Sequence, residues 1–199
     1  FNGTAIRVGG SGTTTNFATL TFNSAGAVVI QEDSATALSG TNTALSLNLD
    51  SAAAITNGSI SVAVTNLADF SGTAITVGGA GTTTNFGTLM FNSAGVVIIT
   101  EDSGTELVNT NTASNLTLNS AGNVTSTGTT TVDTTSSITT NTGSINGAGL
   151  ITAATIDLNA GSGIGNAIAV QTVTSSISAD TTSNNINIDN LLATATTVT

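Results

Sequence analysis

The sequence LTFNSAGAVVIQEDSATAL at residues 20–38 returns as LMFNSAGVVIITEDSGTEL at residues 89–107, which is 69 positions later. The similarity extends upstream, since residues 1–38 and 70–107 align without a gap and share 28 of 38 amino acids. Beyond about residue 130 the copy is lost in detail, while the composition stays the same. A duplicated block of this kind is the sequence signature of a repeat architecture.

A shorter unit lies inside the block and has the form apolar–x–apolar–Asn/Asp–Ser–Ala–Gly/Ala. It recurs at spacings of 27, 42, 27 and 40 residues, starting at Leu20, Leu47, Leu89, Leu116 and, weakened, Ile156. Alternation of apolar and polar residues over a few positions is typical of half-buried β-strands, and clusters of Gly, Asn and Ser separate these strands. Helices are disfavoured because Thr, Asn, Gly and Val are poor helix formers.

Short strands that recur at a steady period predict an all-β, parallel β-solenoid. Each turn of such a coil, here called a lap, buries its inward residues against the laps above and below. The spacings predict laps of about 20–27 residues, with each of the two longer spacings corresponding to two laps. We expect the Asn-Ser-Ala-Gly step to turn a corner through positive φ, which Asn and Gly tolerate. The absence of Pro fits strands whose N–H groups all pair with a neighbouring lap.

The chain is expected to form one continuous solenoid segment over residues 1–199. Within it we distinguish a first copy at 1–69, a second copy at 70–138 and divergent laps at 139–199. Neither an initiator Met nor a signal-peptide pattern is present, so we expect a fragment of a longer chain. Tandem β-sandwiches are disfavoured because 69 residues are few for one module and the chain has no Trp or Cys for its core.

Charge in this chain is scarce and one-sided. Charged residues make up 6% of the sequence, where about 25% is typical. Eleven acidic residues stand against a single basic one, Arg7, for a net charge of −10. Binding to nucleic acid is excluded because it requires Lys and Arg, and adsorption to an anionic membrane surface is excluded for the same reason. No apolar run approaches the ~20 residues of a membrane span.

The second half of the chain carries an LxLxxxGxI rung and an AGSGIGN turn, the latter at residues 160–166. They lie within LTLNSAGNVTSTGTTTVDTTSSITTNTGSI at 116–145 and TIDLNAGSGIGNAIAVQTVTSSISADTTSNNINIDN at 155–190. In these elements the chain resembles the haemagglutinin-type repeats of large secreted bacterial exoproteins, the filamentous haemagglutinin-like adhesins. The resemblance is one of pattern and covers most of the chain. It implies a right-handed parallel β-helix, export to the cell surface, and a role in adhesion, biofilm or filament formation.

Acidic residues form two adjacent pairs, one in each copy: Glu32-Asp33 and Glu101-Asp102. Paired carboxylates suit glycoside hydrolysis, and their oxygens suit Ca²⁺, with Asp50 or Asp69 as further ligands. Neighbouring residues on a strand point to opposite faces, so the carboxylates of one pair do not converge on a substrate, and we expect no enzyme. Our main interpretation is a solvated corner whose charges keep the coil soluble and discourage lateral growth of the sheet. The alternative is a Ca²⁺ site, and no other cofactor is expected.

Two glycine-rich stretches, VGGSGTTTNF at 8–17 and VGGAGTTTNF at 77–86, resemble ligand-binding loops only in part. A phosphate-binding loop requires a Lys after the glycines and a following helix, and neither is expected here. The calcium-binding nonapeptide requires an Asp shortly after its glycines, and both stretches have only Thr there. We therefore expect loops that bulge between laps.

Thr-Asn-Thr triplets begin at Thr41, Thr110 and Thr140. Regular rows of Thr on a flat solenoid face are able to bind ice, which requires the triplets to recur on successive laps. Because the first two lie 69 residues apart, ordinary β-forming Thr on an exposed face is the simpler interpretation.

Together these features predict a non-catalytic structural segment of an extracellular, cell-surface fibre or adhesin stalk. Its expected partner is itself, through end-to-end or lateral association. One alternative is an adhesin face that recognises glycans or another surface, for which the divergent residues 139–199 are the place to look. A further alternative is an ice-binding or Ca²⁺-stabilised solenoid.

Overall fold

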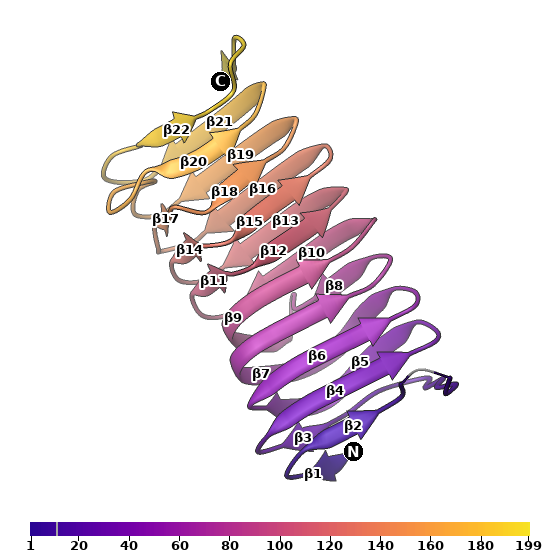
Figure 1. Cartoon of the computed structure of the whole chain (residues 1–199). Helices are drawn as coiled ribbons and strands as arrows, with labels where there is room; N and C mark the ends of the chain where they lie inside the picture. Colours follow the sequence, from indigo (N-terminus) through magenta and orange to yellow (C-terminus); the bar gives the residue numbers. More distant parts are fainter. Residues whose placement is uncertain (11) are drawn as a thin grey trace.

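The protein is a coil of β-strands in the computed structural model, which describes residues 1–10 and 12–199 (Figure 1). Strands of successive laps pair in parallel and stack into a β-solenoid of about ten laps, with the two termini at opposite ends. On the near face of Figure 1 the strands run from left to right as the chain climbs from the N-terminus and returns behind them, so the coil is right-handed. The described residues contain no helix. The predicted all-β parallel solenoid is therefore confirmed.

The strands of nine or more residues all lie in the first half of the coil. Up to residue 92 the strands are β1 (Asn2–Gly3), β2 (Ile6–Val8), β3 (Asn23–Ser24), β4 (Ala27–Glu32), β5 (Thr36–Ala44), β6 (Ser46–Ser51), β7 (Ile55–Ser71), β8 (Ile75–Val77) and β9 (Thr83–Asn92). The strands that follow are β10 (Val96–Glu101), β11 (Thr105–Leu107), β12 (Thr110–Ala113), β13 (Asn115–Ser120), β14 (Val124–Ser126), β15 (Thr129–Val132), β16 (Thr135–Thr140), β17 (Ile145–Asn146), β18 (Leu150–Thr152), β19 (Thr155–Ala160), β20 (Val170–Val173), β21 (Ser176–Thr181), β22 (Ile188–Asn190) and β23 (Thr197–Val198).

Each lap has three sides. In the second half of the coil they are separate strands: β10, β11 and β12 complete a lap before β13 pairs with β10. In the first half one strand bends round the corners, so that the 17-residue β7 pairs with β5, β6, β8 and β9 in turn. The two halves of the coil therefore differ in whether the chain remains a strand at the corners. The parallel stacking of laps is the same in both halves.

Laps are shorter than the longest predicted value. Residues stacked on consecutive laps are 19 positions apart between Val28 and Leu47 and 22 apart between Ile75 and Val97. The predicted 27-residue lap is wrong, because Leu20 stacks on Leu38 and Leu47 belongs to a different side. The prediction that each longer spacing corresponds to two laps is confirmed. The 42 residues from Leu47 to Leu89 span two laps, with Ala68 stacked between them.

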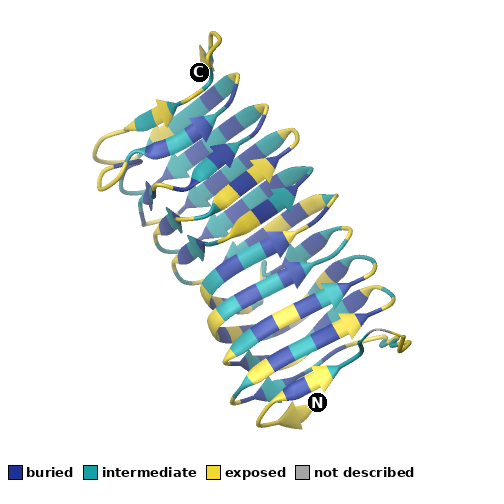
Figure 2. Cartoon of the chain, in the orientation of Figure 1, coloured by how far each residue is buried: buried dark blue, intermediate teal, exposed yellow. Residues whose placement is uncertain are grey.

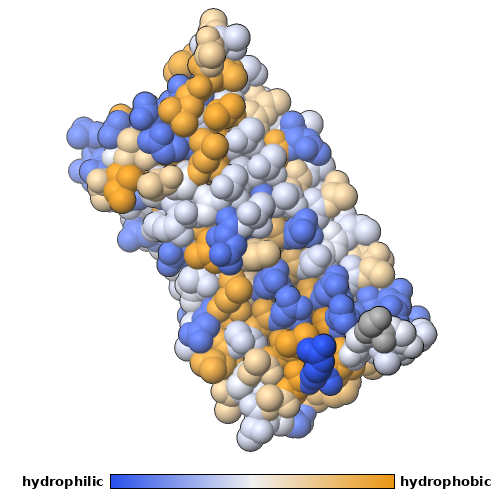
Figure 3. All heavy atoms as spheres, viewed as in Figure 1, coloured by the Kyte–Doolittle hydropathy of each residue, from blue (hydrophilic) through white to orange (hydrophobic). Residues whose placement is uncertain are grey.

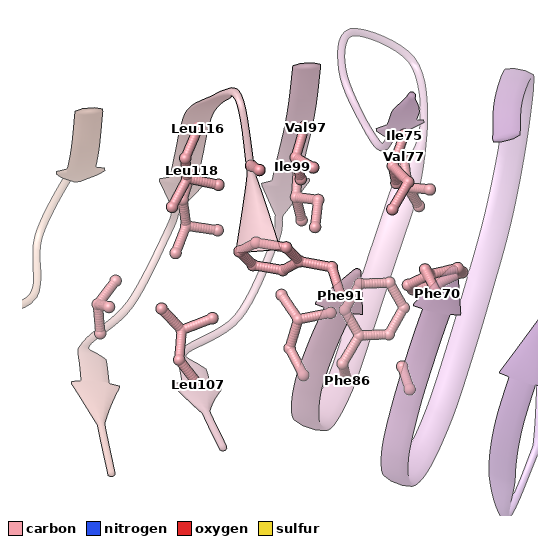
Figure 4. Packing of buried hydrophobic residues seen from close by; sticks show 14 of the residues in the cluster. Phe70, Ile75, Val77, Phe86, Phe91, Val97, Ile99, Leu107, Leu116 and Leu118 are labelled. Atoms are coloured by element: carbon pink, nitrogen blue, oxygen red, sulfur yellow. The ribbon is translucent and has the colours of Figure 1, made fainter. Parts of the chain in front are cut away.

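The core is a set of inward stacks that run along the coil axis. Inward and outward residues alternate along the strands, which gives the banded burial pattern of Figure 2. The largest buried side chains include Phe22, Phe70 and Phe91, each fully buried. Phe70 stacks in register with Phe91, and its ring meets that of Phe86 edge-on at a centroid distance of 5.7 Å (Figure 4). Aromatic contacts of this kind add to the burial of apolar area.

The Asn-Ser-Ala-Gly corners do not use positive φ, contrary to the prediction. Among the non-glycine residues described, only Asn109 and Asn184 have positive φ, and neither lies in such a step. Glycine is required at Gly95 for another reason: a Cβ there would lie 2.2 Å from the backbone oxygen of Thr73 on the lap below. The Ser93 hydroxyl accepts a hydrogen bond from the Gly95 N–H at 3.0 Å. The Asn-Ser-Ala-Gly step therefore needs glycine because two laps approach closely there, and the serine hydroxyl stabilises the turn through its hydrogen bond.

Candidate functional site

The two acidic pairs lie at the corners that follow β4 and β10, and each pair divides between the inside and the outside of the coil. Glu32 and Glu101 are 3% and 1% exposed, whereas Asp33 and Asp102 are exposed. The prediction that these acids face water is therefore wrong for both glutamates. The predicted opposite orientation within each pair is confirmed.

Each buried glutamate binds three donors from its own surroundings. Glu101 Oε1 accepts hydrogen bonds from the Phe86 N–H at 2.9 Å and the Ser103 hydroxyl at 2.8 Å. Its Oε2 accepts one from the Thr105 hydroxyl at 2.6 Å. In the first copy Glu32 accepts hydrogen bonds from the equivalent groups, which are the Phe17 N–H and the hydroxyls of Ser34 and Thr36. Hydrogen bonds to an ionised acceptor are stronger than neutral ones.

The exposed aspartates fasten the same segment from outside. Asp102 Oδ2 accepts a hydrogen bond from the Thr84 N–H at 2.8 Å, and the Asp102 N–H donates to the Thr84 carbonyl at 3.0 Å. Asp33 and Thr15 make the same two contacts, at 2.7 and 3.0 Å. Each pair thus holds the segment that follows the glycine-rich loop on the lap below, at residues 15–17 and 84–86. We call this arrangement the Glu-Asp clamp, formed by Glu32-Asp33 and by Glu101-Asp102.

The clamp geometry does not resemble a calcium site. No group of three or more Asp, Glu, His or Cys side chains gathers as metal ligands in the part of the chain described. Both oxygens of each clamp glutamate already accept hydrogen bonds from protein groups. Burial raises the pKa of the Glu101 carboxyl above its ordinary value of 4.5, and the hydrogen bonds from Thr105, Phe86 and Ser103 offset part of this effect.

The glycine-rich loops bulge from the coil as expected, and their glycines are required. Gly9 has φ of +77°, and a Cβ there would lie 2.2 Å from the Gln31 carbonyl. In the second copy Gly78 has φ of +89°, with the Thr100 carbonyl 2.0 Å from the same position. A side chain at either site would therefore clash with the next lap. The two glycines thus play the same part in the two copies.

A groove of about 510 Å³ lies beside the first loop. It is lined by Arg7, Gly10, Gly12, Thr13, Gln31, Glu32, Asp33, Asp50 and Ala52. The Gln31 amide donates to Asp50 Oδ2 at 3.5 Å across the groove wall. In the second copy the positions of Arg7, Gln31 and Asp50 hold Thr76, Thr100 and Asn119. The groove of the first copy therefore has two charged side chains, Arg7 and Asp50, whose counterparts in the second copy are uncharged.

The divergent laps contain a groove of their own. It has a volume of about 340 Å³ and is lined by Thr140, Asn141, Asn159, Ala160, Gly161, Asp180, Thr181 and Thr182. Its walls are small polar residues together with a single carboxylate. This groove lies within residues 139–199, where the alternative of a ligand-binding face would be sought.

The Thr-Asn-Thr triplets do not form a common row. Asn42 and Asn111 in the first two triplets are fully buried. The Asn111 side-chain oxygen accepts a hydrogen bond from the Phe91 N–H at 3.0 Å, and Asn42 does the same for Phe22. In the third triplet Thr140 is buried and Asn141 is exposed, so the orientation is reversed. The sequence analysis missed these two buried amides, because the triplets were interpreted through their threonines.

No helix in the described part of the chain is long and apolar enough to span a membrane. Comparison of the chain with family models, curated proteins and solved structures gave no match.

Proposed function

We propose that this chain is a non-catalytic structural segment of an extracellular fibre or adhesin stalk at the cell surface. The observation that carries the proposal is an inward stack that continues without a break through most of the coil. It consists of Ile55, Ile75, Val97, Leu116, Ser136, Ile156, Ile177 and Val198. Because each lap contacts only its neighbours, such a coil gains length by duplication without a new core. The duplicated block supports this mode of growth.

Association along the axis is the partner interaction we propose. At the C-terminal end the inward stacks are open: Val198 is 77% exposed and Ile186 is 47% exposed. Figure 3 shows hydrophobic side chains gathered at this end of the coil. A groove of about 400 Å³ there is lined by Ile177, Ala179, Ile186, Ile188, Asn190, Thr196, Val198 and Thr199. A further lap, from this chain or from a second copy, would cover it.

Electron microscopy and small-angle X-ray scattering of the purified segment test the proposed shape in solution. About ten laps at ~4.8 Å each give a rod about 48 Å long. Rods of this length or end-to-end multiples of it are expected, and compact globular particles would contradict the proposal. For the location, antibodies against the segment should label intact cells of the source organism, and external protease should remove the label.

A glycan-binding face is the second candidate, and the groove beside Arg7 favours it. Arginine, amide and carboxylate groups that converge on one groove match the paired hydroxyls of a sugar. The second copy shows that the fold does not need these groups, since Thr76, Thr100 and Asn119 stand in their places.

The chain supplies its own control for the glycan-binding candidate. The triple variant R7T/Q31T/D50N places the second copy's residues in the groove and should leave the melting temperature unchanged. If the groove binds glycans, a glycan array should detect binding by the natural chain and lose it with the variant. Binding that the variant retains, or no binding by either protein, would reject this candidate.

A further inference from the structure

Three buried hydroxyls have no hydrogen-bond partner in the described structure: Ser126 Oγ, Thr130 Oγ1 and Ser136 Oγ. Their side chains are 3%, 0% and 0% exposed. They belong to β14, β15 and β16, which are consecutive strands of a single lap (Figure 1). We call residues 124–140 the polar lap, since each of its three sides carries one unpaired inward hydroxyl.

The stacks explain why these hydroxyls find no partner. Ser136 lies in register between Leu116 below and Ile156 above, and both of those side chains are apolar. Ser126 stacks on Leu107. Thr130 lies in register between Asn111 and Ile151, and the Asn111 amide is already bonded to Phe91 and Val108. Each hydroxyl has thus left water without gaining a hydrogen bond, which destabilises the folded state.

Inward polar residues elsewhere in the coil are paired. The Ser51 hydroxyl donates to the Ser34 carbonyl at 2.6 Å. The Ser120 hydroxyl donates to the Ser103 carbonyl at 2.7 Å. At the end of the polar lap itself, the Thr140 hydroxyl accepts from the Gly143 N–H at 2.8 Å. A buried hydroxyl is therefore compatible with this fold when a corner carbonyl or amide is within reach, and the three unpaired ones are exceptions.

The polar lap also lies at a boundary in the sequence, because the second copy ends at residue 138 and the divergent laps follow. In a solenoid the stability is approximately the sum of terms for each lap and for each interface between neighbouring laps. A lap that is weak on all three sides is consequently where such a coil opens. We propose that the polar lap is an internal breakpoint. It opens first and separates the laps up to β13 from those that begin with β17.

Hydrogen exchange of the complete 199-residue protein, followed by mass spectrometry, tests the breakpoint. Peptides from residues 124–140 should exchange faster than peptides from residues 96–120. The variant S126A/T130V/S136A removes the three hydroxyls and nearly preserves the shape of the side chains. It should slow exchange in the polar lap by about tenfold or more. The reason is that each buried unpaired hydroxyl destabilises the folded state, and the variant removes all three. The melting temperature should rise as well.

The variant S120A is the matched control, because the Ser120 hydroxyl is equally buried but paired. It should accelerate exchange and lower the melting temperature. Equal protection of the polar lap and its neighbours in the natural chain would overturn the proposal. Destabilisation by the triple variant would overturn it too, since it would mean that the hydroxyls are paired in solution. The measurement concerns the isolated protein, so its outcome is independent of the proposed role at the cell surface.

Discussion

Ile6 and Ile75 hold the same place in the two sequence copies, yet they belong to different stacks of the core. The stack that contains Ile6 reaches Ala68 after three laps. Ile75 lies seven residues beyond Ala68 and stacks between Ile55 and Val97. The 69-residue block therefore spans three laps and one further side, and the second copy is rotated by one side about the coil axis.

This rotation identifies the side of a lap, and not the whole lap, as the unit that the duplication preserves. The same local sequence builds the same clamp, loop and corner on whichever side it falls. A third copy of residues 70–138 inserted after Ile138 should therefore fold and continue the coil. It should lengthen the rod by about 16 Å, since three and one-third laps are added at ~4.8 Å each. Small-angle X-ray scattering measures the change in maximum dimension.

A one-residue insertion after Thr117 in β13 is the control for the third copy. It moves the following inward residues of that strand to the outside, so the cooperative thermal transition should be lost or strongly lowered. If the 69-residue insertion behaved like this single-residue insertion, the side would not be the conserved unit.

The sequence predicted the fold class because alternation and period are local properties that stacking preserves. Two-lap spacings were recognisable, since Leu47 and Leu89 return to the same stack with one intermediate residue, Ala68. The 27-residue spacing was misleading because the same local sequence recurs on different sides: Leu107 stacks on Leu89 one lap later, whereas Leu116 lies two sides further along the chain. A repeated motif in a three-sided coil therefore does not reveal the lap length directly.

The burial of the glutamates had a signal in the sequence. Val28, Ile30 and Glu32 alternate along β4, so the strand period places Glu32 on the inward face. The chemical preference of a carboxylate for water outweighed this pattern in the prediction. What the sequence does not reveal is the backbone N–H on the preceding lap, at Phe17 or Phe86 some 15 residues away, that completes the set of three donors to each glutamate.

The clamp should contribute strongly to stability. Glu101→Ala leaves the Phe86 N–H and the Thr105 hydroxyl without their acceptor, and should lower the free energy of unfolding by about 3 kcal/mol. Glu101→Gln keeps one acceptor oxygen and should cost about 1 kcal/mol. Chemical denaturation measures both. Glu106→Ala is the control, because Glu106 is only half-buried on the neighbouring strand, and should change the value by less than about 0.5 kcal/mol. Equal effects at positions 101 and 106 would contradict the clamp.

Two carboxyl groups should make the fold less stable as the pH rises. Burial raises the pKa of Asp69 above its ordinary value of 3.8, with a smaller contribution from nearby Asp50 and a hydrogen bond from Asn48 acting in the opposite direction. The pKa of Glu101 is raised as well, chiefly by burial. In both cases the folded state binds the proton more tightly than the unfolded chain does. Protonation therefore favours folding, and this stabilisation is lost as the pH rises through the raised pKa values.

The measurement is the melting temperature of the natural chain and of Asp69→Asn between pH 3.5 and 7. The variant lacks the titrating group, so its advantage over the natural chain should grow from low to neutral pH. A difference between the two proteins that stays constant over this range, or that grows toward acid, would contradict the assignment.

The Thr-Asn-Thr triplets allow a buried asparagine to be compared with an exposed one in the same local sequence. Asn111→Ala removes the acceptor of the Phe91 N–H, and it also removes the donor to the Val108 carbonyl, which the Asn111 amide reaches at 3.0 Å. An unpaired backbone N–H in the core should lower the free energy of unfolding by about 2 kcal/mol. Asn141→Ala changes the same residue in the same triplet context on the exposed face, and should stay within about 0.5 kcal/mol of the natural chain. If both substitutions proved neutral, the hydrogen bonds of the Asn111 side chain to Phe91 and Val108 would not be stabilising the core. If both were equally costly, the triplet would be stabilised by something that its two orientations share, which the opposite burial of Asn111 and Asn141 argues against.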